Sequence, residues 1–115
     1  FVFSDQRGEL VQLVHSGYEQ VNILASLKGA IRGEHYHKES REAFYIVKGS
    51  VDITAELNGE KEVDHFKCGD MFVVEPFIKH SMYFTEDCLM VQLYDKCVER
   101  KNGTKDIFTE ENLNG

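Results

Sequence analysis

The sequence contains no apolar run near the length that a membrane-spanning helix needs, so we expect no membrane partner. Basic residues are also few, because 13 Lys and Arg stand against 20 Asp and Glu and leave a net charge of −7. That balance argues against general nucleic-acid binding, which needs a basic surface. The three cysteines, Cys68, Cys88 and Cys97, form no CxxC pair and leave an odd count. We therefore expect buried, reduced thiols in a cytoplasmic protein.

The length of 115 residues fits one domain and excludes a second hydrophobic core. No internal repeat is present. From about residue 99 the chain turns polar, and the sequence predicts a domain over 1–98 followed by a polar C-terminal tail over 99–115, exposed or disordered. Because the chain opens on Phe1 and not on Met, we expect the natural protein to have residues before it.

Short segments rich in β-branched and aromatic residues follow one another along the chain, separated by turn signals. Asn58-Gly59 is the strongest of these signals, because a two-residue hairpin turn needs positive φ at both positions. Ten such strands with a single proline predict an all-β sandwich or barrel. The predicted strands are 1–3, 9–14, 20–27, 30–37, 42–47, 51–57, 60–66, 71–74, 80–84 and 89–94.

Three histidines and one glutamate have a spacing that can enclose a divalent metal. Residues two apart on a strand point the same way, so His35 and His37 share one face. A turn over 38–41 brings Glu42 back beside them on the return strand. His80 must arrive from a strand far away in sequence, which a closed or sandwiched sheet allows. The alternative is a pair of histidines on a solvated strand face.

Three neutral imidazoles and one carboxylate suit one divalent transition metal, such as iron, manganese, nickel or zinc, and the sequence does not choose among them. Four protein ligands leave a position open for water or a small-molecule substrate. The alternative is a closed metal site that only stabilises the barrel.

On these residues the chain resembles the cupin superfamily. The first cupin motif is matched at Gly29, His35, His37, Glu42 and Gly49, and the second, in part, at Gly69, Asp70 and His80. Where many cupins have Pro-x-Gly, this chain has Glu75-Pro76-Phe77. The resemblance implies a single-domain double-stranded β-helix, or jelly-roll barrel. Small cupins commonly form homodimers, and we expect the apolar strand over 1–3 to pair with another subunit's sheet.

A narrower resemblance links this chain to cupin enzymes that act on nucleotide sugars. Asp5-Gln6-Arg7-Gly8 and the run Arg32-Gly33-Glu34-His35-Tyr36-His37-Lys38 look like elements of the deoxythymidine-diphosphate-hexose 3,4-ketoisomerases and 3,5-epimerases. The resemblance implies proton transfer by His35 or His37 next to a sugar ketone, with Arg7 and Arg32 holding the diphosphate or sugar. Those enzymes usually work without a metal, and the presence of Glu42 and His80 departs from their pattern.

Three function classes follow. The first is an isomerase or epimerase of an activated sugar in surface-polysaccharide synthesis, the reading we favour. The second is an iron-dependent dioxygenase of a small molecule, and the third a non-catalytic metal- or sugar-binding module. Basic residues at the pocket mouth favour the first, and an apolar pocket with an open metal face favours the second.

Other side chains have more ordinary interpretations. An apolar set is expected in the core, with Phe77 able to narrow the entrance instead. On a regular strand Arg32 would face away from His35, so a solvated arginine is its alternative. His15 and His65 are expected to be exposed, and Lys79 at the rim. The pattern does not decide whether Met90, Gln92 and Tyr94 or their neighbours face inward. The apolar set is Phe44, Ile46, Phe72, Val74, Phe77 and Met82.

Overall fold

The structure is a computed structural model in which residues 1–99 and 103–109 are described. These residues form ten strands and no helix, and each strand overlaps one of the ten predicted segments. No helix among them is long and apolar enough to span a membrane. The strands are β1 (Val2–Asp5), β2 (Gly8–Val11), β3 (Gln20–Ser26), β4 (Ile31–His35), β5 (Glu42–Lys48), β6 (Ser50–Leu57), β7 (Glu60–Lys67), β8 (Met71–Val74), β9 (Lys79–Tyr83) and β10 (Cys88–Tyr94).

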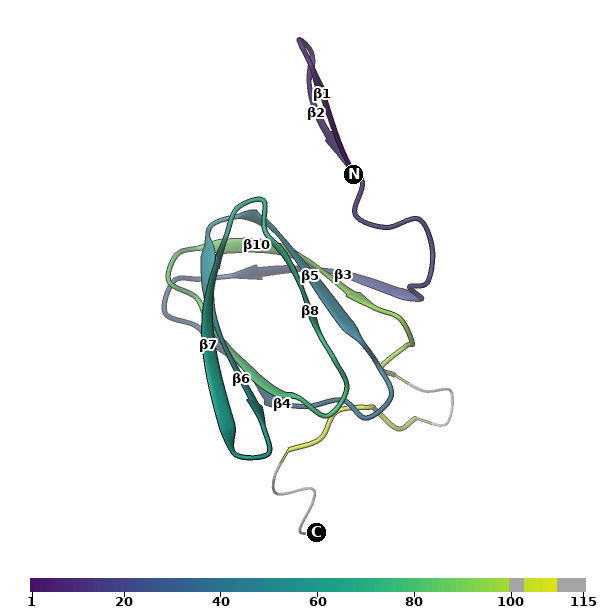
Figure 1. Cartoon of the computed structure of the whole chain (residues 1–115), viewed down its shortest axis with the longest axis vertical. Helices are drawn as coiled ribbons and strands as arrows, with labels where there is room; N and C mark the ends of the chain where they lie inside the picture. Colours follow the sequence, from purple (N-terminus) through teal and green to yellow (C-terminus); the bar gives the residue numbers. More distant parts are fainter. Residues whose placement is uncertain (100–102, 110–115) are drawn as a thin grey trace.

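Eight of these strands form two four-stranded antiparallel sheets that face each other (Figure 1). The first sheet has the order β3-β10-β5-β8, and the second has the order β4-β9-β6-β7. Apart from the β6–β7 hairpin, the chain alternates between the sheets, so strands distant in sequence become neighbours, as β3 and β10 do. This is the predicted all-β jelly-roll barrel of the cupin type, in one domain.

The hydrophobic core lies between the inner faces of the two sheets. Phe44, Ile46 and Met90 from the first sheet pack against Val51 and Met82 from the second, and all are buried. Strand alternation explains the set, because every second residue of each strand points inward. On β10 this places Met90, Gln92 and Tyr94 inside, which settles the phase that the sequence left open.

Phe77 is not a core residue, in contrast to the expectation for the apolar set. Its side chain is 58% exposed, and its backbone has φ +70°, which is rare for a residue other than glycine. The backbone N–H of Phe77 donates to the carbonyl of His37 at 2.6 Å, which holds this conformation between β8 and β9. The ring stacks against Tyr36 at the edge of the barrel.

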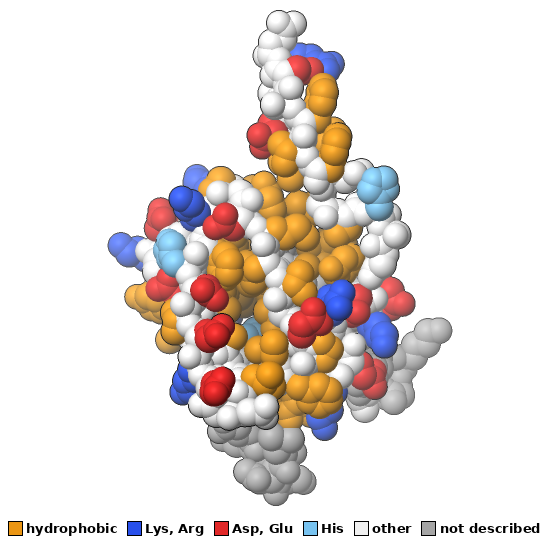
Figure 2. Space-filling view, viewed as in Figure 1, with side chains coloured by type: hydrophobic (Ala, Val, Ile, Leu, Met, Phe, Trp, Pro, Cys, Tyr) orange, Lys and Arg blue, Asp and Glu red, His pale blue; other side chains and the backbone are white. Residues whose placement is uncertain are grey.

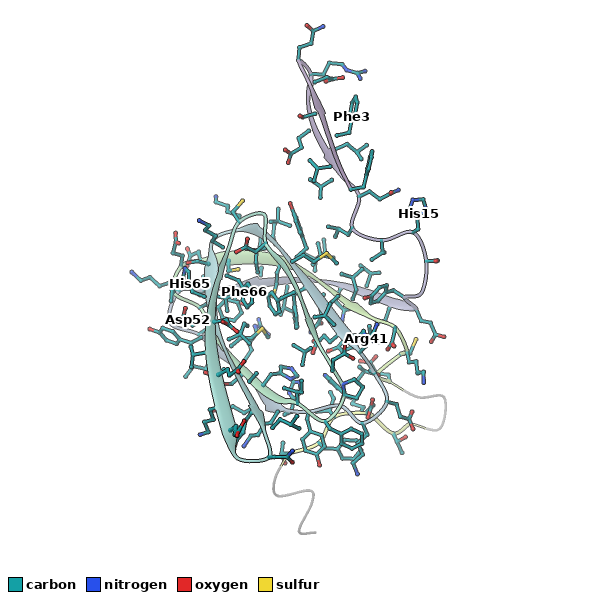
Figure 3. The ribbon with its side chains drawn as sticks, viewed as in Figure 1. Phe3, His15, Arg41, Asp52, His65 and Phe66 are labelled. Atoms are coloured by element: carbon teal, nitrogen blue, oxygen red, sulfur yellow. The ribbon has the colours of Figure 1, made fainter. Side chains whose placement is uncertain are left out.

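The β6–β7 hairpin has the turn that the sequence predicts. Asn58 and Gly59 join the two strands, and both have positive φ, at +54° and +83°. The hairpin register runs without interruption from Ser50 opposite Lys67 to Leu57 opposite Glu60. On the outer side of these strands the predicted exposed His65 contacts Asp52 at 2.6 Å (Figure 3).

The N-terminal hairpin of β1 and β2 projects away from the barrel (Figure 1). The segment that leads to β3 includes His15, which is exposed as expected (Figure 3). The cysteine expectation is correct for Cys88 only, since Cys68 and Cys97 are exposed. Cys68 lies in the turn between β7 and β8, and Cys97 follows β10. Neither thiol lies between the two sheets.

Candidate metal centre

A bulge in β4 aims His35 at the interior. Arg32 lies opposite the buried Met82, but the register then shifts, and His35 instead of Glu34 lies opposite His80. Gly33 and Glu34 take up the extra residue with φ of +92° and +64°. A Cβ at Gly33 would lie 2.8 Å from the His80 carbonyl oxygen, so the close approach of β4 to β9 requires glycine.

The turn between β4 and β5 brings His37 and Glu42 into the same space. Asp106, from the C-terminal segment, accepts backbone hydrogen bonds from Lys38, Glu39 and Ser40 at 2.8–2.9 Å. Its side chain is therefore the acceptor that closes this turn, and it is buried. Glu42 then begins β5 and points inward, fully buried.

The structure brings together all four residues that the spacing singled out. One donor atom from each of His35, His37, Glu42 and His80 lies within 4.8 Å of the others. Glu42 Oε1 is the centre of the group, at 3.2 Å from His37 Nε2 and 3.1 Å from His80 Nε2. The His35 ring lies edge-on to the other two imidazoles, with centroids at 5.0 and 4.7 Å.

Two backbone carbonyls fix how the buried imidazoles are protonated. The Nδ1 of His37 contacts the carbonyl of Asp106, and the Nδ1 of His80 lies 3.2 Å from the carbonyl of Ile78. A carbonyl only accepts hydrogen bonds, so each Nδ1 carries the proton and each Nε2 of a neutral ring presents a lone pair. Two lone pairs and a carboxylate oxygen therefore face one another.

Such a concentration of acceptors needs a cation among them. His80 Nε2 is buried and, among the described residues, makes no hydrogen bond of normal geometry, although Glu42 Oε1 is close. Either a proton shared within the group or a divalent metal supplies the missing positive charge. Three imidazole nitrogens and one carboxylate are ligands for iron, manganese, nickel or zinc, so the residues present fit a divalent metal.

The second carboxylate oxygen of Glu42 is held by the first sheet. Gln92 Nε2 donates to Glu42 Oε2 at 2.6 Å, and Gln92 Oε1 accepts from Asn22 Nδ2 at 2.9 Å. This chain of hydrogen bonds crosses from β3 through β10 to β5 and leaves Oε1 directed at the histidines. It orients the carboxylate in the way that residues behind a metal ligand do.

The pKa values of the cluster residues shift in different directions. Burial lowers the pKa of His35 to about 4, and repulsion from His80 and His37 acts in the same direction. In the metal-free protein burial alone would raise the pKa of Glu42, but the His37 and His80 rings, when they carry a proton on Nε2, hold it at about 2. Burial opposes the charged form of His37, yet contacts with Glu42 and Asp106 outweigh it and raise its pKa. Glu42 is thus ionised and His35 neutral at pH 7.

Tyr94 completes the inner wall beside His37. The two rings meet edge to face with centroids 5.3 Å apart, and Tyr94 is buried. Burial, followed by the negative charge of Glu42, raises the pKa of the Tyr94 phenol, which therefore stays protonated.

The two predicted substrate-binding arginines do not join the group. Arg7 lies in the β1–β2 hairpin with a largely exposed side chain and pairs with Asp5 at 2.6 Å. The β4 bulge puts Arg32 in the inward phase shared with His35, contrary to the regular-strand expectation. The Arg32 guanidinium is held at the edge of β3 by Ser26 Oγ at 2.8 Å and the Ala25 carbonyl at 3.2 Å.

Two cavities flank the strands that carry the cluster. One of about 360 Å³ is lined by Ala55, which lies opposite His80, by Ile78 and by acidic side chains that include Glu62. The other, of about 470 Å³, is lined by Tyr36, Phe77, Lys38 and Lys79. Lys38 and Lys79 are the chain neighbours of His37 and His80, but Lys38 Nζ lies 4.2 Å from the centroid of the Phe108 ring and Lys79 lies opposite Glu56, in the phase that faces away from the cluster.

The sequence interpretation missed Asp106 and the role of Gln92. Gln92 is two residues from the inward-facing Met90 on β10, so strand alternation was the sequence signal that could have placed it inside the barrel. Asp106 belongs to the segment treated as a polar tail after residue 98. Its short bridge, in which Tyr36 and Phe108 exchange backbone hydrogen bonds at 2.9 and 3.0 Å, has no strand-like pattern in the sequence.

Known proteins of similar fold act on nucleotide sugars. A sugar 3,4-ketoisomerase from Thermoanaerobacterium thermosaccharolyticum, solved with TDP, has a TM-score of 0.82 at 18% identity over 98% of this chain and 85% of its own. A 3,4-ketoisomerase from Helicobacter canadensis gives 0.82 at 16% identity, over 98% and 88%. A dTDP-4-dehydrorhamnose 3,5-epimerase from Sulfolobus tokodaii gives 0.66 at 22% identity, over 81% and 65%. At these identities the likeness establishes the fold.

A relative in sequence is an enzyme of a different kind. The chain is 29% identical over 90 residues to a 3-hydroxyanthranilate 3,4-dioxygenase from Burkholderia cenocepacia. That match covers 75% of this chain and 48% of the dioxygenase, so the chain spans about half the length of this relative.

The match to a protein family covers most of the barrel and the N-terminal hairpin. Residues 3–96 match the model of the polysaccharide biosynthesis C-terminal domain. These residues include all four members of the cluster and both sheets. The chain has the cupin-type barrel fold and belongs to the polysaccharide biosynthesis C-terminal domain family.

Proposed function

We propose that this protein is an isomerase or epimerase of a nucleotide sugar in surface-polysaccharide biosynthesis, with one divalent transition metal held by His35, His37, Glu42 and His80. The observation that carries the metal is the meeting of two Nε2 lone pairs and Glu42 Oε1 in a buried space. Family membership and the ketoisomerase and epimerase folds support the sugar substrate. Such a substrate is consistent with the cytoplasmic location expected from the sequence.

The residues around the cluster define what each would do. A metal bound there supplies an electrophile that polarises a sugar carbonyl and stabilises the charge formed when a neighbouring C–H loses its proton. His37 is buried and tied to Asp106, so its role is to hold the centre. His35 is the most accessible of the four, so it is the ligand that faces a bound substrate, and in the metal-free protein its neutral imidazole is the candidate for proton transfer.

The surroundings favour a charged, ring-bearing substrate. Lys38 and Lys79 line the 470 Å³ cavity and can pair with a diphosphate, while the exposed Phe77, which stacks against Tyr36, offers a face for a planar ring. Arg32 lies on the inner side of β4 and is a further candidate for sugar contact. Arg7 can act only from the hairpin, at a distance from its own barrel.

The test is proton exchange at carbon. A TDP-linked 4-keto sugar is incubated with the protein in D₂O, and deuterium entering next to the ketone is followed by NMR. We expect exchange and a new keto-sugar isomer, both lost in His35→Gln. Thr54→Val, on the outer side of β6, is the matched control and should retain both. Failure of the wild type to exchange deuterium with TDP- or UDP-linked keto sugars would contradict the isomerase proposal.

A dioxygenase is the second candidate, because the sequence relative from B. cenocepacia carries that activity. It predicts oxygen uptake with iron(II) and 3-hydroxyanthranilate, measured with an oxygen electrode. Binding of a nucleotide sugar without exchange or oxygen uptake would instead indicate a non-catalytic module.

A further inference from the structure

Residues 103–109, which we call the strap, run along the lower edge of the barrel (Figure 1, yellow). The strap forms no strand of its own, but a bridge ties it to the residue after β4, where Tyr36 and Phe108 exchange backbone hydrogen bonds at 2.9 and 3.0 Å. Two residues before Phe108, the Asp106 N–H donates to the carbonyl of Val98 at 2.9 Å. The backbone of the strap is thus attached both to the end of β4 and to the segment after β10.

The Asp106 side chain joins the strap to the β4–β5 turn, and the residue is 1% exposed. Its two carboxylate oxygens accept the backbone N–H groups of three consecutive residues, Lys38, Glu39 and Ser40, at 2.8–2.9 Å. Successive N–H groups directed at one carboxylate form a backbone anion site, and here the protein fills that site itself. Without this carboxylate three donors would lose their acceptor, so the shape of the turn depends on the strap.

The same residue contacts a member of the cluster through its backbone. The carbonyl of Asp106 accepts the Nδ1–H of His37, so the Nε2 lone pair of this ring is directed at the cluster. Hydrogen bonds of this kind, made behind a metal ligand, fix its tautomer and its direction. One residue of the strap therefore holds both the turn that follows His37 and the ring of His37.

Aromatic rings add apolar contact between the strap and the wall of the 470 Å³ cavity. The Phe108 ring stacks on Tyr36 with centroids 5.7 Å apart, and Tyr36 stacks in turn on Phe77 at 6.4 Å. Lys38 Nζ lies 4.2 Å from the centroid of the Phe108 ring, which is a cation–π contact. Hydrophobic side chains also gather at this edge of the barrel in Figure 2. The strap therefore supports the cavity wall as well as the cluster.

We propose that the strap is part of the metal centre, that Asp106 positions His37, and that metal binding and docking of the strap strengthen each other. The proposal rests on the proposed metal centre. A metal ion needs the Nε2 lone pair of His37 at the cluster, and the docked strap holds it there, so the docked state binds metal more tightly than the undocked state. Because such coupling is reciprocal, an ion at the cluster favours the docked strap by the same factor.

The first test measures the effect of the strap on metal binding, with zinc as the probe. Asp106→Ala should weaken zinc binding 10- to 100-fold. Asp106→Asn, which keeps one acceptor oxygen, should recover part of the affinity. Phe108→Ala removes the ring that stacks on Tyr36 and should weaken zinc binding by a smaller factor, because it loosens the strap without changing the Asp106 side chain.

Asp70→Ala is the matched control for these variants. The Asp70 carboxylate accepts the Lys67 N–H at 2.9 Å in the β7–β8 turn and is not part of the cluster, so zinc affinity should be unchanged. Unchanged zinc affinity in folded Asp106→Ala and Phe108→Ala would overturn the coupling between strap and metal.

The second test measures the reverse effect in the wild-type protein, so it does not depend on the folding of a variant. Hydrogen exchange of the Asp106 and Phe108 amides is followed by NMR with and without zinc. Saturating zinc should slow both amides 10- to 100-fold, the factor expected for zinc binding in Asp106→Ala. The Asp70 amide, which donates to the Lys67 carbonyl at 2.9 Å, is the control and should exchange at an unchanged rate. Equal slowing of all three amides, or of none, would contradict the coupling.

A third measurement separates this proposal from the proposed function. Nitrogen-15 NMR of the zinc-free protein at about pH 9, where imidazoles are neutral, should show the His37 proton on Nδ1 in the wild type and a mixture of tautomers in Asp106→Ala. If this difference is found but zinc does not bind the wild type, the metal proposal and the coupling fail, and the positioning of His37 by Asp106 stands. If zinc binds both proteins equally and the His37 tautomer is the same in both, the metal centre stands and the role of the strap is wrong.

Discussion

The two sheets of the barrel differ in what they present to the outside. The second sheet carries polar side chains such as Asp52, Thr54 and Lys61 on its outer side beside the exposed Val63, whereas the outer side of the first exposes Val21, Ile23 and Val73. Inside, the first sheet carries Asn22, Glu42 and Gln92, polar residues that a core would otherwise exclude. The first sheet therefore carries the polar residues that the proposed metal centre needs.

The largest effect is expected from a substitution of Glu42, on the inner side of the first sheet. In the wild type, saturating zinc should stabilise the fold by about 4 kcal/mol at a thousandfold excess over the dissociation constant. Glu42→Gln should lose nearly all of this gain, because the charge that balances the metal is gone. Thermal unfolding with zinc and with EDTA measures it. A wild-type gain that persists in Glu42→Gln would place the metal elsewhere.

The next largest effect is expected from breaking the hydrogen-bond chain that runs from Asn22 through Gln92 to Glu42. Gln92→Leu removes the amide that holds Glu42 Oε2, and zinc affinity should fall 10- to 100-fold. Calorimetric titration provides the dissociation constants. Asn22→Val should have a smaller effect, since Asn22 acts only through Gln92. Equal losses in the two variants would argue against a relay.

Gly33→Ala tests the bulge of the second sheet. The substitution forces an alanine into φ +92° and sets its Cβ 2.8 Å from the His80 carbonyl. We expect a loss of about 1–3 kcal/mol in the free energy of unfolding, measured by urea denaturation. Gly59→Ala, at positive φ but with no atom near its Cβ, is the control and should lose less.

The pH dependence of the free energy of unfolding of the metal-free protein tests the burial of His35. Its pKa is lowered to about 4 by burial and by the neighbouring histidines, so the unfolded chain binds a proton more readily than the folded one. The contribution of neutral His35 to the free energy of unfolding is fully present above the unfolded-state pKa of about 6.5 and is lost as the pH falls towards 4. Urea denaturation in EDTA should show a shallower loss between pH 6.5 and 4 in His35→Gln. Parallel curves would show that His35 is not desolvated.

The smallest effect is expected on the outside of the second sheet. Thr54→Val changes an outward residue of β6 and should alter the free energy of unfolding by less than about 0.5 kcal/mol, without changing zinc affinity. A larger change in the free energy of unfolding would contradict the outward position of Thr54 on β6.

Sequence reasoning predicted all ten strands and the positions of the four cluster residues, because strand alternation and turn residues are local signals. The regular-strand prediction for Arg32 missed the bulge at Gly33 and Glu34, which leaves no pattern of its own, whereas the solvated alternative agrees with the exposed Arg32 side chain. Sequence reasoning was wrong about Phe77, whose exposure follows from a positive φ fixed by a contact with His37. Asp106 acts across 69 positions, a separation that local pattern does not report.

Elemental analysis of the wild-type protein, purified without added metal and compared with Glu42→Gln, tests the central claim most directly. The account predicts about one transition-metal ion per chain in the wild type and close to none in the variant. A folded wild-type protein that carries no stoichiometric metal, and takes up none from equimolar zinc, iron(II), manganese or nickel, would contradict it.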